Sequence, residues 1–298
     1  MTPSWLWALF SVLAAAGLTT RNAMQRELTA HLGAAGATHV RFLFGFPFAL
    51  VFLAVVIAVT RAALPHTNPM FWLWVISGAL SQILGTTLML LTMESRSFVV
   101  AIAYNKTEPV FVAVLGYLFL GDVLSPGAMA AIGICTAGVI VISLNPKGGM
   151  GDARTALLGL GSGAMFAISA IGYRGAILAL GARGYVLPAT FTLAIGLVTQ
   201  AVLLTAWLAV RAPRVLREIV QLWRPSLFAG FMGALSSELW FLAFALAPAA
   251  NVLTLGLVDV VFAQIVSRFL FKHRTTAREY AGIAVLLAGA ILLVAVHR

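Results

Sequence analysis

Charged residues are scarce in this chain: aspartate, glutamate, lysine and arginine make up 9% of its 298 residues, whereas 61% are hydrophobic. Soluble domains carry about 25% charged residues, so this composition excludes a protein whose whole surface faces water. The apolar residues form runs of about 20, the length that a helix needs to cross a hydrocarbon core. Short segments of alternating polarity, which transmembrane barrels require, are absent. We therefore predict an all-α membrane protein.

Cysteine is almost absent too. Cys135 is alone within an apolar run, so the chain can form neither an internal disulfide nor a cysteine cluster, and packing is its expected role. Neither a Gly-Lys-Ser/Thr phosphate loop nor a His-Glu-x-x-His zinc motif occurs. A membrane-embedded enzyme would need some such reactive group of residues. We expect no enzyme activity, no catalytic residues, no metal and no cofactor.

The net charge of +10 could indicate a nucleic-acid-binding protein. Its basic residues do not form one patch, however, but lie in the connections between the apolar runs. This placement is typical of membrane proteins, whose cytoplasmic loops are rich in lysine and arginine. We expect the lipid bilayer to be a partner and nucleic acid not to be one.

The apolar runs predict about ten membrane-spanning helices. In residues 1–148 the expected spans are Ser4–Met24, His39–Thr60, Pro69–Met93, Ser97–Leu120 and Ser125–Leu144. In residues 149–298 they are Ala153–Leu180, Tyr185–Val210, Pro225–Ala247, Ala250–Phe271 and Thr276–Val296. The second span is the least distinct, because Gly33, Gly36 and Pro47 interrupt its beginning.

The two halves, 1–148 and 149–298, resemble each other at a nearly constant offset. Glu108-Pro-Val-Phe matches Asp259-Val-Val-Phe 151 residues later, and the same offset pairs Gly138 with Gly289. Gly78-Ala-Leu-Ser recurs as Gly233-Ala-Leu-Ser at an offset of 155. These matches predict two five-helix repeats. Because five is odd, the second repeat must cross the membrane in the opposite direction.

Loop charges support this inverted topology. The loop after the fourth span carries Gly121-Asp122, whereas its counterpart in the second half carries Lys272-His273-Arg274. Arg61 is alone in its loop, but the equivalent loop holds the arginines Arg211, Arg214, Arg217 and Arg224. The positive-inside rule therefore predicts a multi-pass protein of the cell inner (plasma) membrane, with its basic loops cytoplasmic and both termini outside.

Polar side chains at membrane depth form the candidate substrate site. Ionisable groups there cost at least about 2.5–3.5 kcal/mol on insertion scales, so they indicate function, and inverted-repeat transporters bind substrate near the midplane. The expected lining consists of Ser81, Gln82, Tyr104, Lys106, Glu108, Ser237, Glu238, Trp240 and Asp259. The alternative is that these groups pair to link packed helices. Lys106 and Glu108 lie about 200° apart around a helix, so both cannot face one cavity squarely.

A second polar group lies near expected helix ends. Arg21-Asn22 and Tyr173-Arg174 occupy matching positions of the first and sixth spans, and His39 begins the second. They are candidate gate residues. The alternative is that the arginines extend toward lipid headgroups.

The fourth span carries a family resemblance. Glu108-Pro-Val-Phe, followed by Gly121-Asp122 and Gly138, resembles the half-repeat of the drug/metabolite transporter (DMT) superfamily, EamA type, and within it the YddG-type aromatic amino-acid exporters. The second half departs from the pattern, since Val260 replaces the proline and Lys272-His273 replaces the Gly-acid pair. The resemblance implies efflux of amino acids or small metabolites without ATP hydrolysis.

We therefore expect a monomeric transporter that exports amino acids, aromatic or apolar, or similar small metabolites by alternating access around a central cavity. A zwitterionic substrate needs a cation and an anion, and the candidate lining contains both. The excess of carboxylates equally suits cationic drugs, and a lipid or nucleotide-sugar-type metabolite carrier or a receptor are further alternatives. Carboxylates at mid-depth could exchange protons, so protons are a candidate coupling ion.

Overall fold

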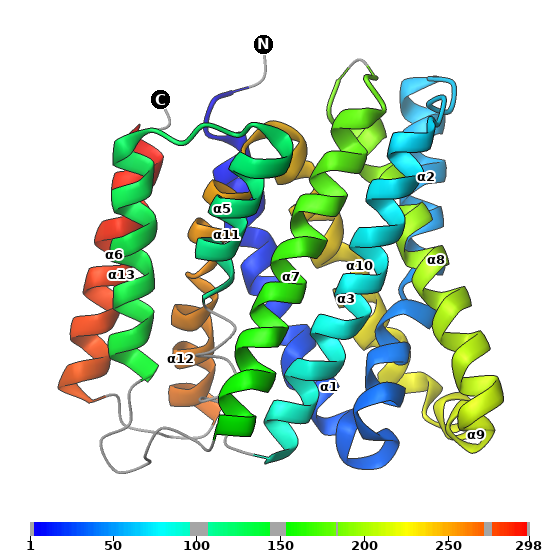
Figure 1. The fold of residues 1–298 in the computed structure, drawn as a ribbon. Coiled ribbons are helices and arrows are strands. Elements are labelled where there is room, and N and C mark those ends of the chain that lie inside the picture. The colour runs from blue at the N-terminus through cyan, green and yellow to red at the C-terminus, as the bar shows by residue number, and fades with distance from the viewer. Residues whose placement is uncertain (1–2, 96–106, 144–152, 183, 271–275, 297–298) are drawn as a thin grey trace.

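The computed structural model describes residues 3–95, 107–143, 153–182, 184–270 and 276–296, and the regular structure within them is helical (Figure 1). The first half comprises α1 (Leu6–Leu43), α2 (Phe46–Thr60), α3 (Pro69–Ser95), α5 (Glu108–Leu120) and α6 (Pro126–Ser143). The second half comprises α7 (Ala153–Ala179), α8 (Val186–Arg211), α9 (Pro213–Gln221), α10 (Trp223–Leu246), α11 (Ala249–Gly256), α12 (Asp259–Leu270) and α13 (Ala277–Val296).

Six helical segments of the described chain are long and apolar enough to cross a membrane, and three shorter apolar helices accompany them. Large apolar side chains such as Val59, Val210 and Ile291 are exposed on the outer surface of the bundle, with 70–81% of their area accessible. Exposure of such an apolar surface to water is unfavourable, whereas its contact with lipid tails is not. The prediction of an all-helical, multi-pass membrane protein is confirmed.

The ends of the first two expected spans were predicted wrongly. The sequence suggested a connection from Met24 to His39, but helical structure occupies this interval apart from one break, and α1 ends at Leu43. The break is at Gly33, whose φ of 65° and ψ of 174° are non-helical. Glycine adopts positive φ without steric penalty, so the helix changes direction there and then resumes. As a result His39 lies inside a helix and is buried, instead of beginning one.

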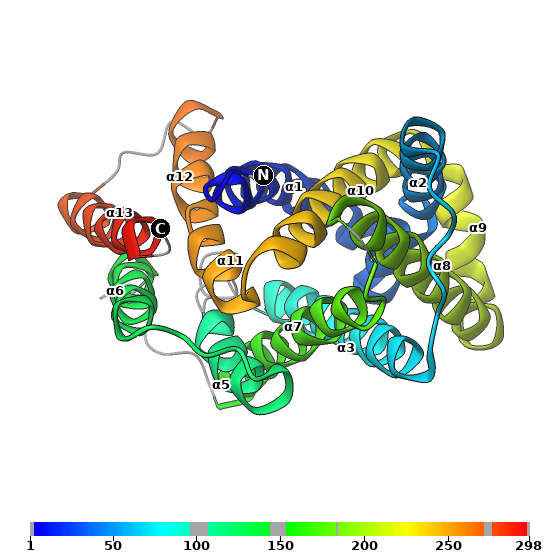
Figure 2. The ribbon, with the colours of Figure 1, turned by 90° about the horizontal axis from the view of Figure 1, so that it is seen from above.

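Three helix pairs dominate the packing: α1 on α10, α3 on α7, and α6 on α13. Viewed along the bundle, α6 and α13 form one side of the molecule, and α2, α8 and α9 form the other (Figure 2). The four helices α1, α3, α7 and α10 lie between these groups, with α11 and α12 next to α1. This central group positions the candidate site.

Helices α6 and α13 approach each other closely at small residues. A Cβ atom added to Gly138 would lie 2.6 Å from the backbone nitrogen of Leu286, and one added to Gly289 would lie 2.9 Å from the backbone nitrogen of Cys135. Neither position leaves space for a side chain. Close backbone contact at glycine is a common way for membrane helices to associate, because lipid provides no hydrophobic drive between them.

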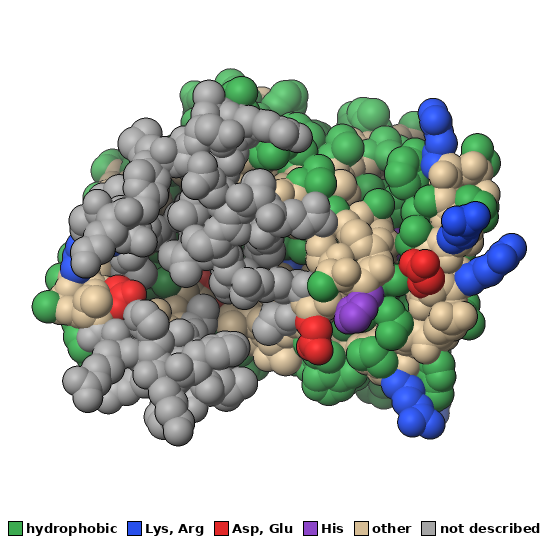
Figure 3. All heavy atoms as spheres, turned by 90° about the horizontal axis from the view of Figure 1, so that it is seen from below, with side chains coloured by type: hydrophobic (Ala, Val, Ile, Leu, Met, Phe, Trp, Pro, Cys, Tyr) green, Lys and Arg blue, Asp and Glu red, His purple; other side chains and the backbone are tan. Residues whose placement is uncertain are grey.

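One end of the bundle carries a group of arginines. Both termini lie at one end, and α9 lies at the other (Figure 1). The arginines of this region are exposed: Arg211, Arg214, Arg217 and Arg224. In the view of that end, lysine and arginine side chains gather at the edge formed by α9 (Figure 3).

Candidate functional site: a central cavity

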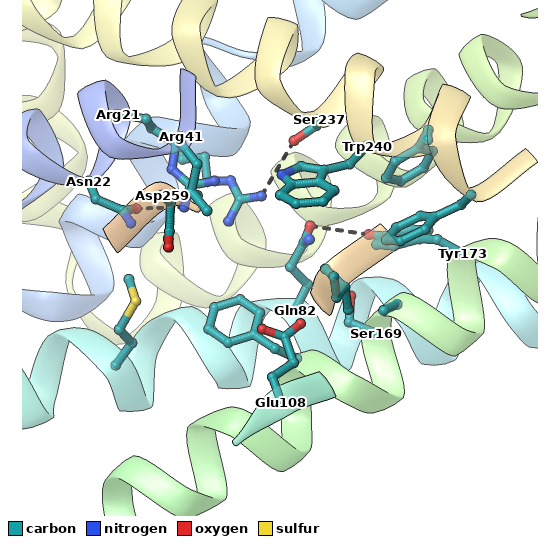
Figure 4. Close-up of a pocket in the computed structure, with 17 residues that line it drawn as sticks. Arg21, Asn22, Arg41, Gln82, Glu108, Ser169, Tyr173, Ser237, Trp240 and Asp259 are labelled. Atoms are coloured by element: carbon teal, nitrogen blue, oxygen red, sulfur yellow. Dashed lines mark hydrogen bonds between the residues drawn. The ribbon is translucent and has the colours of Figure 1, made fainter. Parts of the chain in front are cut away.

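A cavity opens where α1, α3, α7 and α10 meet, beside the first residues of α5 and α12 (Figure 4). The centres of water molecules can occupy a volume of about 120 Å³ inside it. A single buried water needs about 10–15 Å³ by this measure, so the space admits several waters or part of a small solute. Such a cavity at the junction of packed helices is a common place for a ligand site.

Two carboxylates at the beginnings of helices line the cavity. Glu108 is the first residue of α5, directly after Thr107, and Asp259 is the first residue of α12, where a turn at Leu257 and Val258 separates it from α11. The Oγ1 of Thr19 in α1 donates a hydrogen bond to the backbone carbonyl of Asp259 at 3.4 Å. The break therefore lies against α1, and the carboxylate reaches the cavity from this side (Figure 4).

Two arginines line the same cavity. Arg21 lies in the first part of α1 and Arg41 in the part beyond the break at Gly33, and each is only 3% exposed. Figure 4 shows both side chains on the side of the cavity where Asp259 lies. The described part of the lining thus holds two cations and two carboxylates.

Aromatic rings form a large part of the cavity wall. They are contributed by α7 and α10 and belong to Phe166, Tyr173, Trp240, Phe241 and Phe244. The rings of Tyr173 and Phe241 are 4.6 Å apart, and those of Trp240 and Phe244 are stacked at 6.2 Å. Trp240 also lies directly over Gly256, where any side chain would collide with its ring. These contacts hold the aromatic rings in place beside the cavity.

Amide and hydroxyl groups complete the lining. Gln82 accepts hydrogen bonds at its Oε1 atom from the hydroxyl of Tyr173 at 3.5 Å and from Nε2 of Gln200 at 2.9 Å. Asn22 and Ser237 line the cavity on the arginine side, and Ser169 lines it on α7. These groups can orient a polar ligand without adding charge.

Several residues of the predicted substrate site line the cavity, namely Gln82, Glu108, Ser237, Trp240 and Asp259. Ser81 is buried, and the carboxylate of Glu238 accepts a hydrogen bond from the hydroxyl of Thr190 in α8, so neither side chain contributes to the lining. Tyr104 and Lys106 lie outside the described residues.

The predicted gate residues have different environments. Arg21, Asn22 and Tyr173 line the cavity. Arg174 forms an ion pair with Asp122 instead, and the Nε2 atom of His39 lies 3.0 Å from the hydroxyl of Thr205 in α8. Both are buried between helices and neither borders the cavity.

Sequence reasoning missed Arg41 as a lining residue. It placed the beginning of a span at His39, two residues before Arg41, because the helical segment directly after Gly33 was not recognised. The applicable signal was present, since an ionisable residue inside an apolar run is a functional candidate. Missed as well were the apolar and aromatic residues of the lining: Leu18, Met89, Phe166, Ala170, Phe241, Phe244 and Leu253.

Within the described residues, no group of three or more histidine, cysteine, aspartate or glutamate side chains could hold a metal ion.

Comparison with known proteins identifies a family for the first half of the chain. Residues 5–144 match the model of the EamA-like transporter family. No curated protein matches the chain. Among solved structures, one titled "Crystal structure of protein" aligns with a TM-score of 0.72 at 14% identity, covering 99% of this chain and 97% of the other. At this identity the likeness concerns the fold, which extends over both halves.

Proposed function

Residues 5–144 belong to the EamA-like transporter family, and from this premise we propose that the chain exports amino acids with aromatic or large apolar side chains by alternating access. Family membership indicates small-molecule transport across a membrane. The narrower proposal, an amino-acid substrate, depends on the chemistry of the cavity.

The observation that carries the proposal is the combination of both charges with an aromatic wall in one cavity. An α-amino acid presents a carboxylate and an ammonium group close together, and the lining offers Arg21 and Arg41 to the first and Glu108 and Asp259 to the second. The indole of Trp240 can stack on a flat side chain or contact the ammonium group. A zwitterion with an aromatic side chain satisfies all three features.

Cationic drugs fit this lining less well. Two carboxylates favour a cation, but Arg21 and Arg41 oppose it from the same cavity. Among the described residues of the lining the charges are thus balanced, and a zwitterion leaves this balance unchanged.

Alternating access requires two states related by exchange of the halves, and the packing supports such a relation. Gly138 and Gly289 are equivalent at an offset of 151, and so are Cys135 and Leu286. The contact of Gly138 with Leu286 and the contact of Gly289 with Cys135 are therefore counterparts of each other. The pairing of α1 with α10 is likewise exchanged for that of α7 with α3. We propose that residues 1–148 and 149–298 are inverted repeats, and that Glu108 and Asp259 occupy equivalent positions at the beginnings of helices.

Counterflow in proteoliposomes tests the function directly. Vesicles that contain only this protein are loaded with unlabelled L-phenylalanine, and entry of labelled L-phenylalanine is measured. We expect transient accumulation, which Trp240→Ala should reduce at least about fivefold because a stacked ring contributes about 1 kcal/mol or more. Trp207→Ala is the matched control, since that ring is 50% exposed on α8, away from the cavity.

The competitors distinguish the alternatives. Excess unlabelled L-tryptophan or L-leucine should inhibit the counterflow, whereas the cation tetraphenylphosphonium should not. If tetraphenylphosphonium is itself accumulated and phenylalanine is not, the protein is a cationic-drug exporter and the amino-acid proposal is wrong.

A further inference from the structure

The side chains of Arg21 and Arg41 lie next to each other although they belong to different parts of α1. A Cβ atom added to Gly233 of α10 would be 3.4 Å from Cδ of Arg21 and 3.4 Å from Cγ of Arg41. Both aliphatic stems therefore cross α10 at the residue without a side chain. Two side chains of like charge thus lie side by side against the same face of α10.

The contacts that the structure gives these two guanidinium groups are to neutral atoms. Arg41 donates to the hydroxyls of Thr86 at 3.3 Å and Ser237 at 3.5 Å, both long hydrogen bonds. Arg21 donates to the amide oxygen of Asn22 at 2.6 Å. The Nε atoms of both arginines are buried without a hydrogen-bond partner in the described part of the chain. Each group thus retains donors that could bind a ligand.

The repeat counterpart of Arg21 is neutralised in a different way. Arg174, at an offset of 153 from Arg21, donates from Nε and Nη2 to the two carboxylate oxygens of Asp122, both at 2.9 Å. The residue that corresponds to Asp122 in the second half, at an offset of 151, is His273. The first half therefore supplies a carboxylate, Asp122, to Arg174 of the second half. At the equivalent position of the second half, which the repeat assigns to Arg21, the sequence has a histidine instead.

Two neighbouring, buried cations that donate only to neutral oxygens are energetically costly, because such hydrogen bonds compensate their desolvation less than an ion pair like that of Arg174 with Asp122. An oxyanion between them would remove this cost, and guanidinium groups bind carboxylates with two parallel hydrogen bonds. The space beside them is the cavity, so the ligand can reach them from it.

The geometry points to Arg21 and Arg41 as an anion subsite that binds the carboxylate group of the transported molecule. This inference rests on the proposed function and assigns one end of its substrate. With the carboxylate at the two arginines, the side chain extends toward Trp240 and Tyr173, and the ammonium group lies within the reach of the cavity carboxylates. Arg41, which anchors this subsite beyond the break at Gly33, becomes a substrate-binding residue.

Binding of matched probes to the purified protein tests the subsite. The probes are L-phenylalanine and L-phenylalaninamide, which differ only in whether a carboxylate is present, and their affinities are measured by calorimetry. Arg41→Gln and Arg21→Gln should each weaken phenylalanine binding at least about tenfold, the loss of one charge-assisted contact, and change amide binding less than about twofold. Arg61→Gln, on an exposed residue at the end of α2, is the control and should change neither. Equal losses for both probes, or no loss, would overturn the assignment.

A second measurement separates this inference from the proposed function. If the unaltered protein binds neither phenylalanine nor its amide, the aromatic amino-acid proposal fails, and the subsite is then tested with benzoate, acetate and inorganic phosphate. Thermal stabilisation by benzoate or acetate that disappears in Arg41→Gln supports a carboxylate site. Stabilisation by phosphate alone indicates a phosphate-bearing substrate and overturns the carboxylate assignment, as does a lack of response to all three anions. Size-exclusion profiles establish that each variant is folded.

Discussion

Arg174 and Asp122 form a two-pronged ion pair that joins α7 to the loop after α5, with both N···O distances at 2.9 Å. The Nη1 atom of Arg174 donates in addition to the backbone carbonyls of Phe244 and Ala247 at the end of α10. One guanidinium group thus holds three segments together. Arg21, which we propose as its repeat counterpart, instead lines the cavity, so the two arginines have a structural role in one half and a proposed binding role in the other.

This difference predicts opposite effects on stability. Arg174→Met should destabilise the protein by about 3–5 kcal/mol, because it leaves the Asp122 carboxylate and two carbonyls without their partner. Thermal unfolding in detergent measures the effect, and the double variant Arg174→Met/Asp122→Leu should recover part of the loss. A single variant that melts at the temperature of the unaltered protein would contradict the structural role.

Neutralising either cavity arginine should have the reverse effect. Arg41→Met removes one of two neighbouring cations whose other contacts are weak hydrogen bonds to hydroxyls, so we expect an unchanged or higher melting temperature in the absence of substrate. The same thermal assay measures it beside Arg174→Met. A fall as large as that of Arg174→Met would mean that Arg41 is a structural element.

The α6–α13 contact predicts a sharp dependence on side-chain size. Gly138→Ala and Gly289→Ala place a methyl group 2.6 Å and 2.7 Å from atoms of the facing helix, and each should cost about 1–3 kcal/mol through overpacking. Gly133→Ala on the same α6 is the matched control, because nothing lies within 4 Å of its added methyl group. Thermal unfolding of the three variants checks this, and equal stability of all three would refute the close approach.

The loop charges predict sidedness. A reporter fused after Gly121 should read non-cytoplasmic, and one fused after Arg274 should read cytoplasmic, because equivalent loops of inverted repeats face opposite sides. Alkaline phosphatase and green fluorescent protein fusions at both positions measure it. The same reading at both positions would exclude the inverted-repeat topology.

Proton coupling is tested by three isosteric variants, Glu108→Gln, Glu238→Gln and Asp259→Asn. Each keeps the side-chain volume and removes the titratable proton. If a proton drives export, at least one of them should abolish accumulation under an imposed pH gradient while counterflow continues. Because Glu238 faces Thr190 and not the cavity, we expect its variant to change substrate affinity least. Accumulation by all three variants would exclude these carboxylates as the coupling site.

The carboxylates at the centre of the fold could be located from the sequence because each is conspicuous locally. Glu108 and Asp259 are rare charges within apolar runs, and the match of their flanking residues predicts equivalent depth. Glu238 has the same local signal, but α10 presents it to α8. Whether such a carboxylate faces the cavity or a neighbouring helix depends on how its helix is rotated about its own axis. The sequence of a single apolar run does not determine this rotation.

Composition and run length alone determined that this protein is a helical membrane protein, because the hydrocarbon core imposes its requirement on each segment separately. The internal match likewise indicated two related halves. Only the tertiary structure decided that α1 resumes after Gly33 and brings Arg41 beside Arg21 at Gly233. That arrangement depends on helices distant in sequence packing against one another, and it is this packing that decides which buried charges share a cavity.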